Sequence, residues 1–329
     1  MMRRREFITL LGGAAAAWPL AARAQRARAI GVIVSTDPRN RDYQAYVAAF
    51  EQVLRSRGWR NGHNLHIHYR WAGGDEQRWR VLAAEMVELT PDLIVAHTTA
   101  GLAAVLQATQ TIPIVFLGVS DPIAQGFVAS LTHPAGNITG FAAHEFSIGG
   151  KWLDLLKQIM PAIRRVVLLG NPMTSPQFKF NMASIEAAGA SFGVEVIGAP
   201  VHDKAGIEAA IAGLSGQQFG GLILGNDQFI RSRHLADVVE LAARHRVPAI
   251  YSQREFVVAG GLMCYGYLPV EQWRGVAFYV DRILKGAKAG DLPVQQPVKY
   301  ELVINLKAAQ ALGLELPMGL MLRADEVIE

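Results

Sequence analysis

The sequence predicts an α/β protein of two doubly wound lobes, each with a parallel sheet covered by helices. Short runs rich in β-branched residues alternate with helix-length segments of apolar periodicity, which is typical of this class. The alternation occurs twice, each time with enough strands for a separate sheet. The chain has 329 residues, of which 51% are apolar, so its length suggests about two domains and its composition can supply two cores.

Residues 1–24 have the pattern of an export signal. Three arginines precede an apolar, alanine-rich stretch, and Ala22-Arg23-Ala24 resembles a cleavage site. The apolar stretch is short for a bilayer span and contains Pro19. Arg4-Arg5 also fits a twin-arginine signal, so either that route or general secretion is open. We therefore expect a signal peptide over 1–24, cleavage after Ala24 and a periplasmic protein.

Cleavage there changes the charge of the chain. The full chain has a formal net charge of +4, and the loss of four arginines and one glutamate leaves +1. With no block of like charges in addition, binding to nucleic acid is not expected. The single cysteine, Cys264, excludes an intramolecular disulfide, and we expect it to be a buried, small apolar side chain.

In the first half, the helix expected at residues 43–57 has apolar residues at helical spacing and ends at Gly58. The other helices are expected at 77–89 and 99–110. The strands are expected at residues 29–34, 65–69, 92–96, 114–117 and 137–141.

In the second half, Pro161 ends a helix expected at residues 151–160. The other helices are expected at 176–192, 207–214, 230–245 and 270–285. The strands are expected at 165–169, 194–197, 221–224, 249–252, 261–265 and 300–304, the last of which is expected to finish the chain.

Polar residues follow several of these strands. Open α/β sheets bind ligands at the carboxyl ends of their strands. Unpaired N–H groups at helix starts suit a carboxylate, and an ionised aspartate suits an ammonium group. Each polar residue taken alone is better explained by helix capping, but their recurrence at the same edge of both lobes indicates a cleft between the lobes. The residues are Ser35, Thr36, Thr98, Thr99, Asp121, Asn171 and Asp227.

Searches for catalytic motifs give little. The sequence contains no G-x-G-x-x-G, P-loop, H-E-x-x-H or G-x-S-x-G motif. His66 and His68 share a strand face but match no recognised metal-ligand spacing, and a solvated face is favoured. We therefore expect a protein that is not an enzyme, with no catalytic residue, no metal and no cofactor.

Several motifs resemble one known family. In order and over nearly the whole chain from about residue 29, they look like the ABC-transporter substrate-binding proteins related to the tryptophan-binding TrpX lipoproteins. The stretches that carry the likeness are 111–116 (TIPIVF), 119–122 (VSDP), 136–140 (GNITG) and 299–307 (KYELVINLK), with further matches at 58–64, 284–286 and 291–293.

The resemblance implies a type I periplasmic binding protein, whose two lobes are joined by a hinge of three chain crossings. The crossings are expected near residues 144–148, 265–268 and 296–300. Lobe 1 would then comprise 25–145 plus 268–298, and lobe 2 would comprise 146–267 plus 299–329. The helix at 270–285 would belong to lobe 1.

The family's site residues fall on Thr99, Asp121 and Asp227. The family's Gly-Thr-Pro turn reads Thr98-Thr99-Ala100 here, so its backbone is expected to differ. Ser35, Thr98 and Thr99 would bind a carboxylate, and Asp121 and Asp227 an ammonium group or hydroxyls. Asn171 and Tyr265 would be secondary contacts.

The resemblance implies the solute-binding component of an ABC importer. It would be a monomer that closes on a small polar solute, an amino acid first or a small carboxylate second. Its partners would be a permease and an ATPase encoded elsewhere. A periplasmic sensor that presents its bound form to a signalling receptor is the alternative, since the same cleft would serve it.

Overall fold

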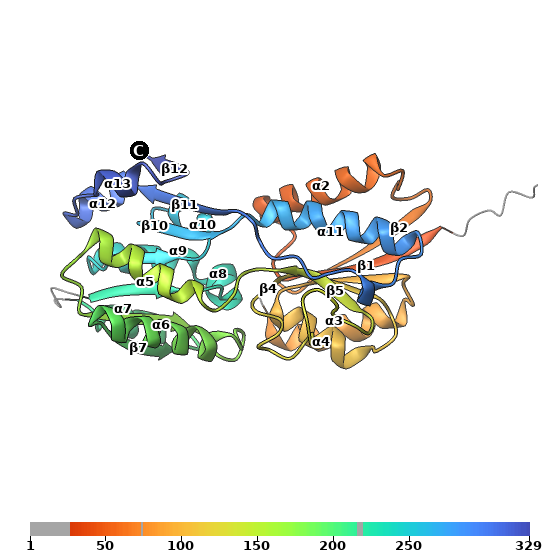
Figure 1. The fold of residues 1–329 in the computed structure, drawn as a ribbon, viewed down its shortest axis with the longest axis horizontal. Helices are drawn as coiled ribbons and strands as arrows, with labels where there is room; N and C mark the ends of the chain where they lie inside the picture. The colour runs from red at the N-terminus through yellow and green to blue at the C-terminus, as the bar shows by residue number, and fades with distance from the viewer. Residues whose placement is uncertain (1–26, 74, 216–219) are drawn as a thin grey trace, which may run out of the picture.

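The protein is described by a computed structural model that covers residues 27–73, 75–215 and 220–329. Two lobes lie side by side along the long axis of the molecule, each with a sheet between layers of helices (Figure 1). The predicted signal peptide, residues 1–24, lies outside the described residues.

The sheet of lobe 1 has the strand order β2-β1-β3-β4-β5, and every pairing in it is parallel. The central strands read as continuous apolar runs because helices cover both of their faces. Its strands are β1 (Arg28–Val34), β2 (Leu65–Trp71), β3 (Leu93–His97), β4 (Ile114–Val119) and β5 (Ile138–Ala142).

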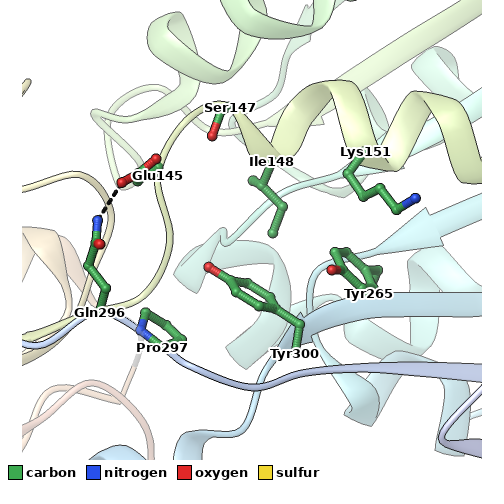
Figure 2. Close-up of a pocket in the computed structure, with 8 residues that line it drawn as sticks. All are labelled: Glu145, Ser147, Ile148, Lys151, Tyr265, Gln296, Pro297 and Tyr300. Carbon is green, nitrogen blue, oxygen red and sulfur yellow. Dashed lines mark hydrogen bonds between the residues drawn. The ribbon is translucent and has the colours of Figure 1, made fainter.

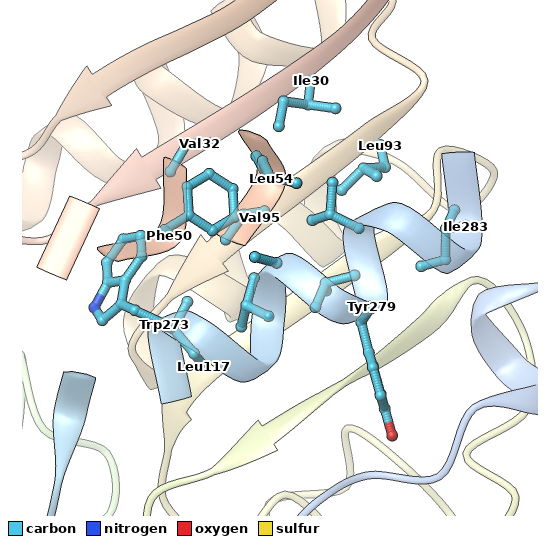
Figure 3. Close-up of a cluster of buried hydrophobic side chains, with 14 of the residues drawn as sticks. Ile30, Val32, Phe50, Leu54, Leu93, Val95, Leu117, Trp273, Tyr279 and Ile283 are labelled. Atoms are coloured by element: carbon cyan, nitrogen blue, oxygen red, sulfur yellow. The ribbon is translucent and has the colours of Figure 1, made fainter. Parts of the chain in front are cut away.

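Helices from distant parts of the chain cover this sheet. One face carries α2 (Arg41–Ser56) and α11 (Pro269–Leu284), and the other carries α3 (Glu76–Glu88) and α4 (Thr99–Ala108). Phe50 of α2 meets Trp273 of α11 edge to face, with ring centroids 6.0 Å apart (Figure 3). The helix predicted at 270–285 thus packs in the first lobe, far from its neighbours in sequence.

The sheet of lobe 2 has the order β12-β11-β10-β9-β8-β6-β7. Its strands are β6 (Arg165–Gly170), β7 (Glu195–Pro200), β8 (Gly220–Leu224), β9 (Ala249–Tyr251), β10 (Met263–Tyr267), β11 (Tyr300–Asn305) and β12 (Glu326–Ile328). One of its cores includes residues of α7 (Lys204–Ala212), α8 (Gln228–Arg233), α9 (Leu235–Arg244) and α10 (Arg254–Val258). The opposite core includes residues of α5 (Ile148–Ile159), α6 (Phe178–Phe192), α12 (Leu306–Leu312) and α13 (Met318–Met321).

One strand pairing in lobe 2 departs from the parallel arrangement that the sequence predicts. Strands β10 and β11 pair antiparallel, with Tyr267 opposite Tyr300. The reason lies in the crossings. The chain leaves β10 toward lobe 1, forms α11 and a short 3-10 turn (Ala289–Asp291) there, and returns into β11 from that side. Because it enters lobe 2 where β10 left it, β11 must run the opposite way.

Two expectations in the second half are wrong. The helix predicted at 230–245 is two helices, α8 and α9, which meet at His234. There the imidazole Nδ1 lies 2.8 Å from Asp237 Oδ2 and the backbone φ is −129°. The strand at 300–304 does not finish the chain, since α12, α13 and β12 follow it. Their side chains complete the outer core of lobe 2.

Candidate functional site

The carboxyl ends of both sheets face each other across the space between the lobes. The guanidinium of Arg231, on α8 of lobe 2, donates a hydrogen bond to the hydroxyl of Tyr43 on α2 of lobe 1. It also lies 5.2 Å from the centroid of the Tyr43 ring. Beside this contact, Arg233 Nη2 lies 3.9 Å from Asp75 Oδ2. The two lobes therefore touch through the loops and helix starts that follow their strands.

A hollow opens at the mouth of this junction. It has a volume of ≈ 1040 Å³, open to solvent, and lies between the lobes. Trp79 and Ala100 line that hollow from lobe 1, and Met173 and Pro176 line it from lobe 2. None of the predicted site residues lines this hollow, which lies beside the junction of the two sheet edges. We call that junction, with the hollow at its mouth, the interlobe cleft.

The lobe 1 wall of the cleft is polar and neutral. Ser35, directly after β1, has its hydroxyl 2.9 Å from His97 Nδ1 at the end of β3. The His97 ring packs 5.3 Å from the Tyr43 ring. Burial holds the pKa of His97 well below its usual value, and the nearby Arg231 charge lowers it further. Hence His97 is neutral, and the wall offers hydroxyls and rings. Thr36, next to Ser35, is also buried.

The start of α4 is unusual. Thr98 has a φ of +71°, in the left-handed region that favours glycine. Its hydroxyl accepts a 3.4 Å hydrogen bond from the Gly101 amide, so Thr98 caps the helix. This is the position where the sequence replaces the family's glycine by threonine, and the backbone keeps the conformation that a glycine would adopt.

Thr99 and Ser120 lie side by side at the ends of β3 and β4. The Ser120 amide donates to the Thr99 hydroxyl at 3.4 Å. The Ser120 hydroxyl is buried and has no hydrogen-bond partner in the part of the chain that the structure describes. Buried polar atoms are nearly always satisfied by protein, water or ligand, so this hydroxyl is a candidate ligand contact.

Asp121 has a local role. Its carboxylate accepts a 3.0 Å hydrogen bond from the Ala124 amide, and its own amide donates to the His144 carbonyl at 2.9 Å. It is half-buried, with a φ of +37°. The side chain thus caps the turn that follows β4, next to the first hinge crossing.

Asp227 and Asn171 form the corresponding edge of lobe 2. Asp227 Oδ2 accepts from the Asn171 amide at 2.7 Å, and Oδ1 accepts from the Ile230 amide at 2.9 Å. Burial raises the pKa of Asp227, while the backbone N–H groups that it accepts from oppose the rise. Asn171 Oδ1 accepts from the Met173 amide at 2.9 Å. Asp227 therefore caps α8, which carries Arg231 one turn further on.

Arg231 was missed by the sequence analysis, although it is central to the cleft. Its Nη2 also donates to Gln228 Oε1 at 2.7 Å. Burial alone would lower the pKa of Arg231, but Tyr43, Glu255 and Tyr267 around it raise the pKa overall. The residue therefore stays a cation inside the junction. The available signal was its position one helical turn after Asp227, in the helix that begins at the predicted edge of lobe 2.

Three more residues surround Arg231 and were also missed. Glu255 and Gln253 follow β9, and Tyr267 ends β10. Gln253 Nε2 and Glu255 Oε2 are buried without a hydrogen-bond partner among the described residues. Tyr267 reaches lobe 1, because a β-carbon at Gly118 would lie 3.4 Å from its hydroxyl and 3.2 Å from the His97 ring. The cleft thus joins a cation, a carboxylate and unpaired polar atoms.

Tyr265 lies apart from this group. Its ring stacks on Tyr300, with centroids 5.5 Å apart, in a hollow beside the hinge. The structure therefore brings the predicted residues together in two edge groups, one per lobe, and places Tyr265 in neither. The residues of the lobe 1 edge are Ser35, Thr36, Thr98, Thr99 and Asp121, and those of the lobe 2 edge are Asn171 and Asp227.

Two searches of the described residues gave negative results. No group of three or more His, Cys, Asp or Glu side chains there is arranged to hold a metal ion. No helix there has the length and apolar character needed to cross a membrane. Cys264 is buried, as expected from its sequence context, and burial raises the pKa of its thiol.

The fold defines a class. Two α/β lobes, three crossings and facing sheet edges are the features of the type I periplasmic binding protein fold. The predicted fold class is confirmed by solved structures. A conserved domain protein from Vibrio cholerae has a TM-score of 0.83 at 24% identity, with 92% of this chain and 99% of that chain covered. An ABC domain from Streptococcus pneumoniae in complex with L-Trp has a TM-score of 0.80 at 23% identity and the same coverage.

The family follows from the sequence comparison. Residues 29–328 match the ABC transporter substrate binding protein family, so this chain belongs to that family. A tyrosine-binding protein of Clostridioides difficile is 27% identical over 266 residues, which cover 81% of this chain and 76% of the relative. The resemblance inferred from motifs is thereby confirmed.

Proposed function

We propose that this protein is the solute-binding component of an ABC importer and that its solute is an amino acid with an aromatic side chain. The observation that carries the proposal is that a buried cation, Arg231, and the carboxylate of Glu255, whose charge acts on it, both lie at the interlobe cleft. An amino acid carries both charges of the opposite sign on neighbouring atoms, so it matches this pair.

The solute's two charged groups have distinct partners in this proposal. The guanidinium of Arg231 binds the carboxylate, since arginine presents a planar set of donors that fits a carboxylate. Glu255 Oε2 accepts from the ammonium group. Ser35, Thr98 and Thr99 supply hydroxyls from lobe 1. Asp121, Asn171 and Asp227 hold the loops and the start of α8 in position, and Thr36 belongs to the same wall.

The preference for an aromatic side chain rests on the cleft and on relatives. Tyr43, His97 and Tyr267 bring rings to the junction, and aromatic side chains prefer offset or edge-to-face contacts with one another. The relative from Clostridioides difficile is described as tyrosine-binding, and the Streptococcus structure contains L-Trp. A small carboxylate is the second candidate because Arg231 alone would hold it.

Closure follows from the same contacts. The solute touches both lobes, so it favours the closed state in which the lobes meet. In that state the hydrogen bond from Arg231 to Tyr43 joins the two lobes directly. A permease reads that closed form, and an ATPase on another chain supplies the energy. The solute leaves unchanged, since no step of this scheme makes or breaks a bond. The family favours this importer role over a sensor.

The location belongs to the proposal as well. An N-terminal segment with three arginines, an apolar stretch and Ala22-Arg23-Ala24 would direct the chain to the periplasm, where it acts as a monomer. N-terminal sequencing of protein recovered from the periplasm tests this, and a mature chain beginning at Gln25 is the expected result.

A panel of solutes tests the function. Purified protein is heated with L-tyrosine, L-tryptophan, L-phenylalanine, their D-isomers and small carboxylates. An L-aromatic amino acid is expected to raise the melting temperature most, since a ligand that binds the folded state stabilises it. Mass spectrometry should recover that amino acid unaltered. A response to no amino acid, or a chemically changed solute, contradicts the proposal.

A further inference from the structure

A second hollow lies beside the hinge and shares no residue with the two edge groups of the interlobe cleft. It encloses ≈ 740 Å³, open to solvent, and we call it the hinge pocket. Figure 2 shows its walls: Glu145 and Gln296 at one end, Lys151 at the other, and Tyr265 and Tyr300 between them. Tyr265 is the residue that sequence analysis assigned to the cleft and that the structure places elsewhere.

Two tyrosine rings form one side of this pocket. Tyr265 and Tyr300 are nearly parallel, with an interplanar angle of 17° and centroids 5.5 Å apart. Burial and the neighbouring Tyr265 and Glu145 raise the pKa of Tyr300 to about 12, so its hydroxyl stays neutral. Faces of such rings attract a cation or stack on a flat apolar group.

The Glu145 end of the pocket carries a negative charge. At one end, the Glu145 carboxylate accepts a hydrogen bond from the Gln296 side-chain amide, which joins the first and third hinge crossings. At the other end, Lys151 Nζ lies 2.8 Å from Asp154 Oδ2, one helical turn away, so its charge is compensated. The Lys151 charge therefore has an acidic partner, whereas Glu145 is held only by the neutral side-chain amide of Gln296 at the opposite end.

From this combination we propose that the hinge pocket binds a small organic amine, with its ammonium group at Glu145 and its flat or apolar body against Tyr300. The carboxylate supplies a charge-assisted hydrogen bond, and the ring adds a cation–π or stacking contact. Because Glu145 and Gln296 stand on two of the crossings, the bound amine touches segments that bend when the lobes move.

Phenethylamine is a suitable probe, with 3-phenylpropionate and 2-phenylethanol as anionic and neutral compounds of matched shape. Calorimetry on the purified protein should show the amine binding at millimolar concentration and the two analogues binding about tenfold more weakly or not at all, as a charge-assisted contact implies. Equal binding of all three compounds, or none of the amine, overturns the proposal.

Four variants locate the binding. Glu145→Gln keeps the shape and should weaken the amine about tenfold, and Tyr300→Leu should weaken it by a few fold. Glu315→Gln, an exposed carboxylate in the C-terminal region, is the matched control and should change nothing. Glu255→Gln, which removes the carboxylate of the cleft, should also leave amine binding intact. Loss of binding in Glu255→Gln with retention in Glu145→Gln would assign the amine to the cleft and overturn the proposal.

Discussion

The two walls of the interlobe cleft differ in chemistry although they occupy equivalent edges of similar sheets. The lobe 1 wall consists of hydroxyls, rings and a neutral imidazole at Ser35, Thr99 and His97. The lobe 2 wall carries the ionic groups at the centre of the cleft, Arg231 and Glu255, on two short helices.

This difference assigns different tasks to the lobes. Charged side chains attract a zwitterion over a longer range, and more strongly per contact, than neutral groups do. In the proposed function, lobe 2 therefore holds the solute's charged groups. Neutral hydroxyls and rings act at short range and mainly through shape, so lobe 1 completes the site when the lobes meet. The four predictions below test that division of tasks, from the largest expected effect to the smallest.

Removing the cation of lobe 2 should have the largest effect. Arg231→Gln loses both the solute carboxylate contact and the contact with Tyr43, and the dissociation constant should rise roughly a hundredfold, about 3 kcal/mol. Calorimetry with the amino acid selected by the panel measures it. Arg233→Gln is the matched control on the same helix. Its pair with Asp75 spans 3.9 Å between partly exposed groups, so it should cost under about 1 kcal/mol. Similar losses in both variants would refute a special role for Arg231.

The carboxylate of lobe 2 comes next. Glu255→Gln preserves shape but removes the charge that accepts from the ammonium group, so binding should weaken by about 2 kcal/mol, roughly thirtyfold. The exposed Glu240→Gln on α9 is the control. The des-amino analogue of the solute should bind wild type and Glu255→Gln equally. If the analogue still distinguishes the two proteins, Glu255 does not act through the ammonium group.

Because His97 in the lobe 1 wall is neutral in the folded protein, the free energy of unfolding should depend on pH. Burial depresses the pKa of His97 in the folded state, so the unfolded chain binds a proton first as the pH falls below about 6.5. The free energy of unfolding that neutral His97 contributes is fully present above about pH 6.5 and is lost progressively as the pH falls below that value. Burial also lowers the pKa of His144 at the hinge to about 4, so this histidine adds to the loss of stability at low pH.

The variant His97→Phe isolates the first histidine. Phenylalanine keeps ring contacts with Tyr43 and Trp273 but cannot be protonated. Urea unfolding between roughly pH 6 and 5 should show a slope smaller by about 1.4 kcal/mol per pH unit than in wild type, which corresponds to one proton. An unchanged slope would mean that His97 is charged in the folded protein, and the lobe 1 wall would no longer be neutral.

Much of the lobe architecture follows from local sequence. The strands β1, β3 and β4 are buried on both faces, and their apolar runs at residues 30–34, 93–96 and 114–117 therefore stand out. The polar residues after them, such as Ser35 and Thr99, indicate the cleft edge because parallel strands end together. The antiparallel β11 was not predictable in this way, since its direction depends on a crossing that local patterns do not encode.

The central residues of the cleft were hidden for a related reason. Arg231 and Glu255 lie in short helices, and each gains its importance from groups more than a hundred residues away or in a neighbouring loop. Tyr43 fits the apolar stripe of α2 in sequence, while its hydroxyl meets lobe 2. Thr98, Asp121 and Asp227 each cap the start of a helix or turn in the structure. Their positions in the sequence do not distinguish a capping role from contact with a solute.

Thr98 allows the smallest and most local test. A φ of +71° costs a residue with a β-carbon free energy that glycine does not lose, about 1–3 kcal/mol. Thr98→Gly removes that strain and a long 3.4 Å capping bond, and glycine is itself an acceptable cap. The greater freedom of glycine in the unfolded chain offsets part of the gain, so stability to urea should rise by about 1 kcal/mol.

Thr98→Ala provides the matched comparison, because alanine keeps the β-carbon and the strain but loses the hydroxyl. It should lower stability by about 1 kcal/mol, the usual cost of a lost cap. Opposite signs for the two variants would show that lobe 1 maintains a strained backbone at the cleft, where such strain is often found. If both variants destabilise equally, the Thr98 hydroxyl matters more than its backbone, and the lobe 1 wall depends on that cap.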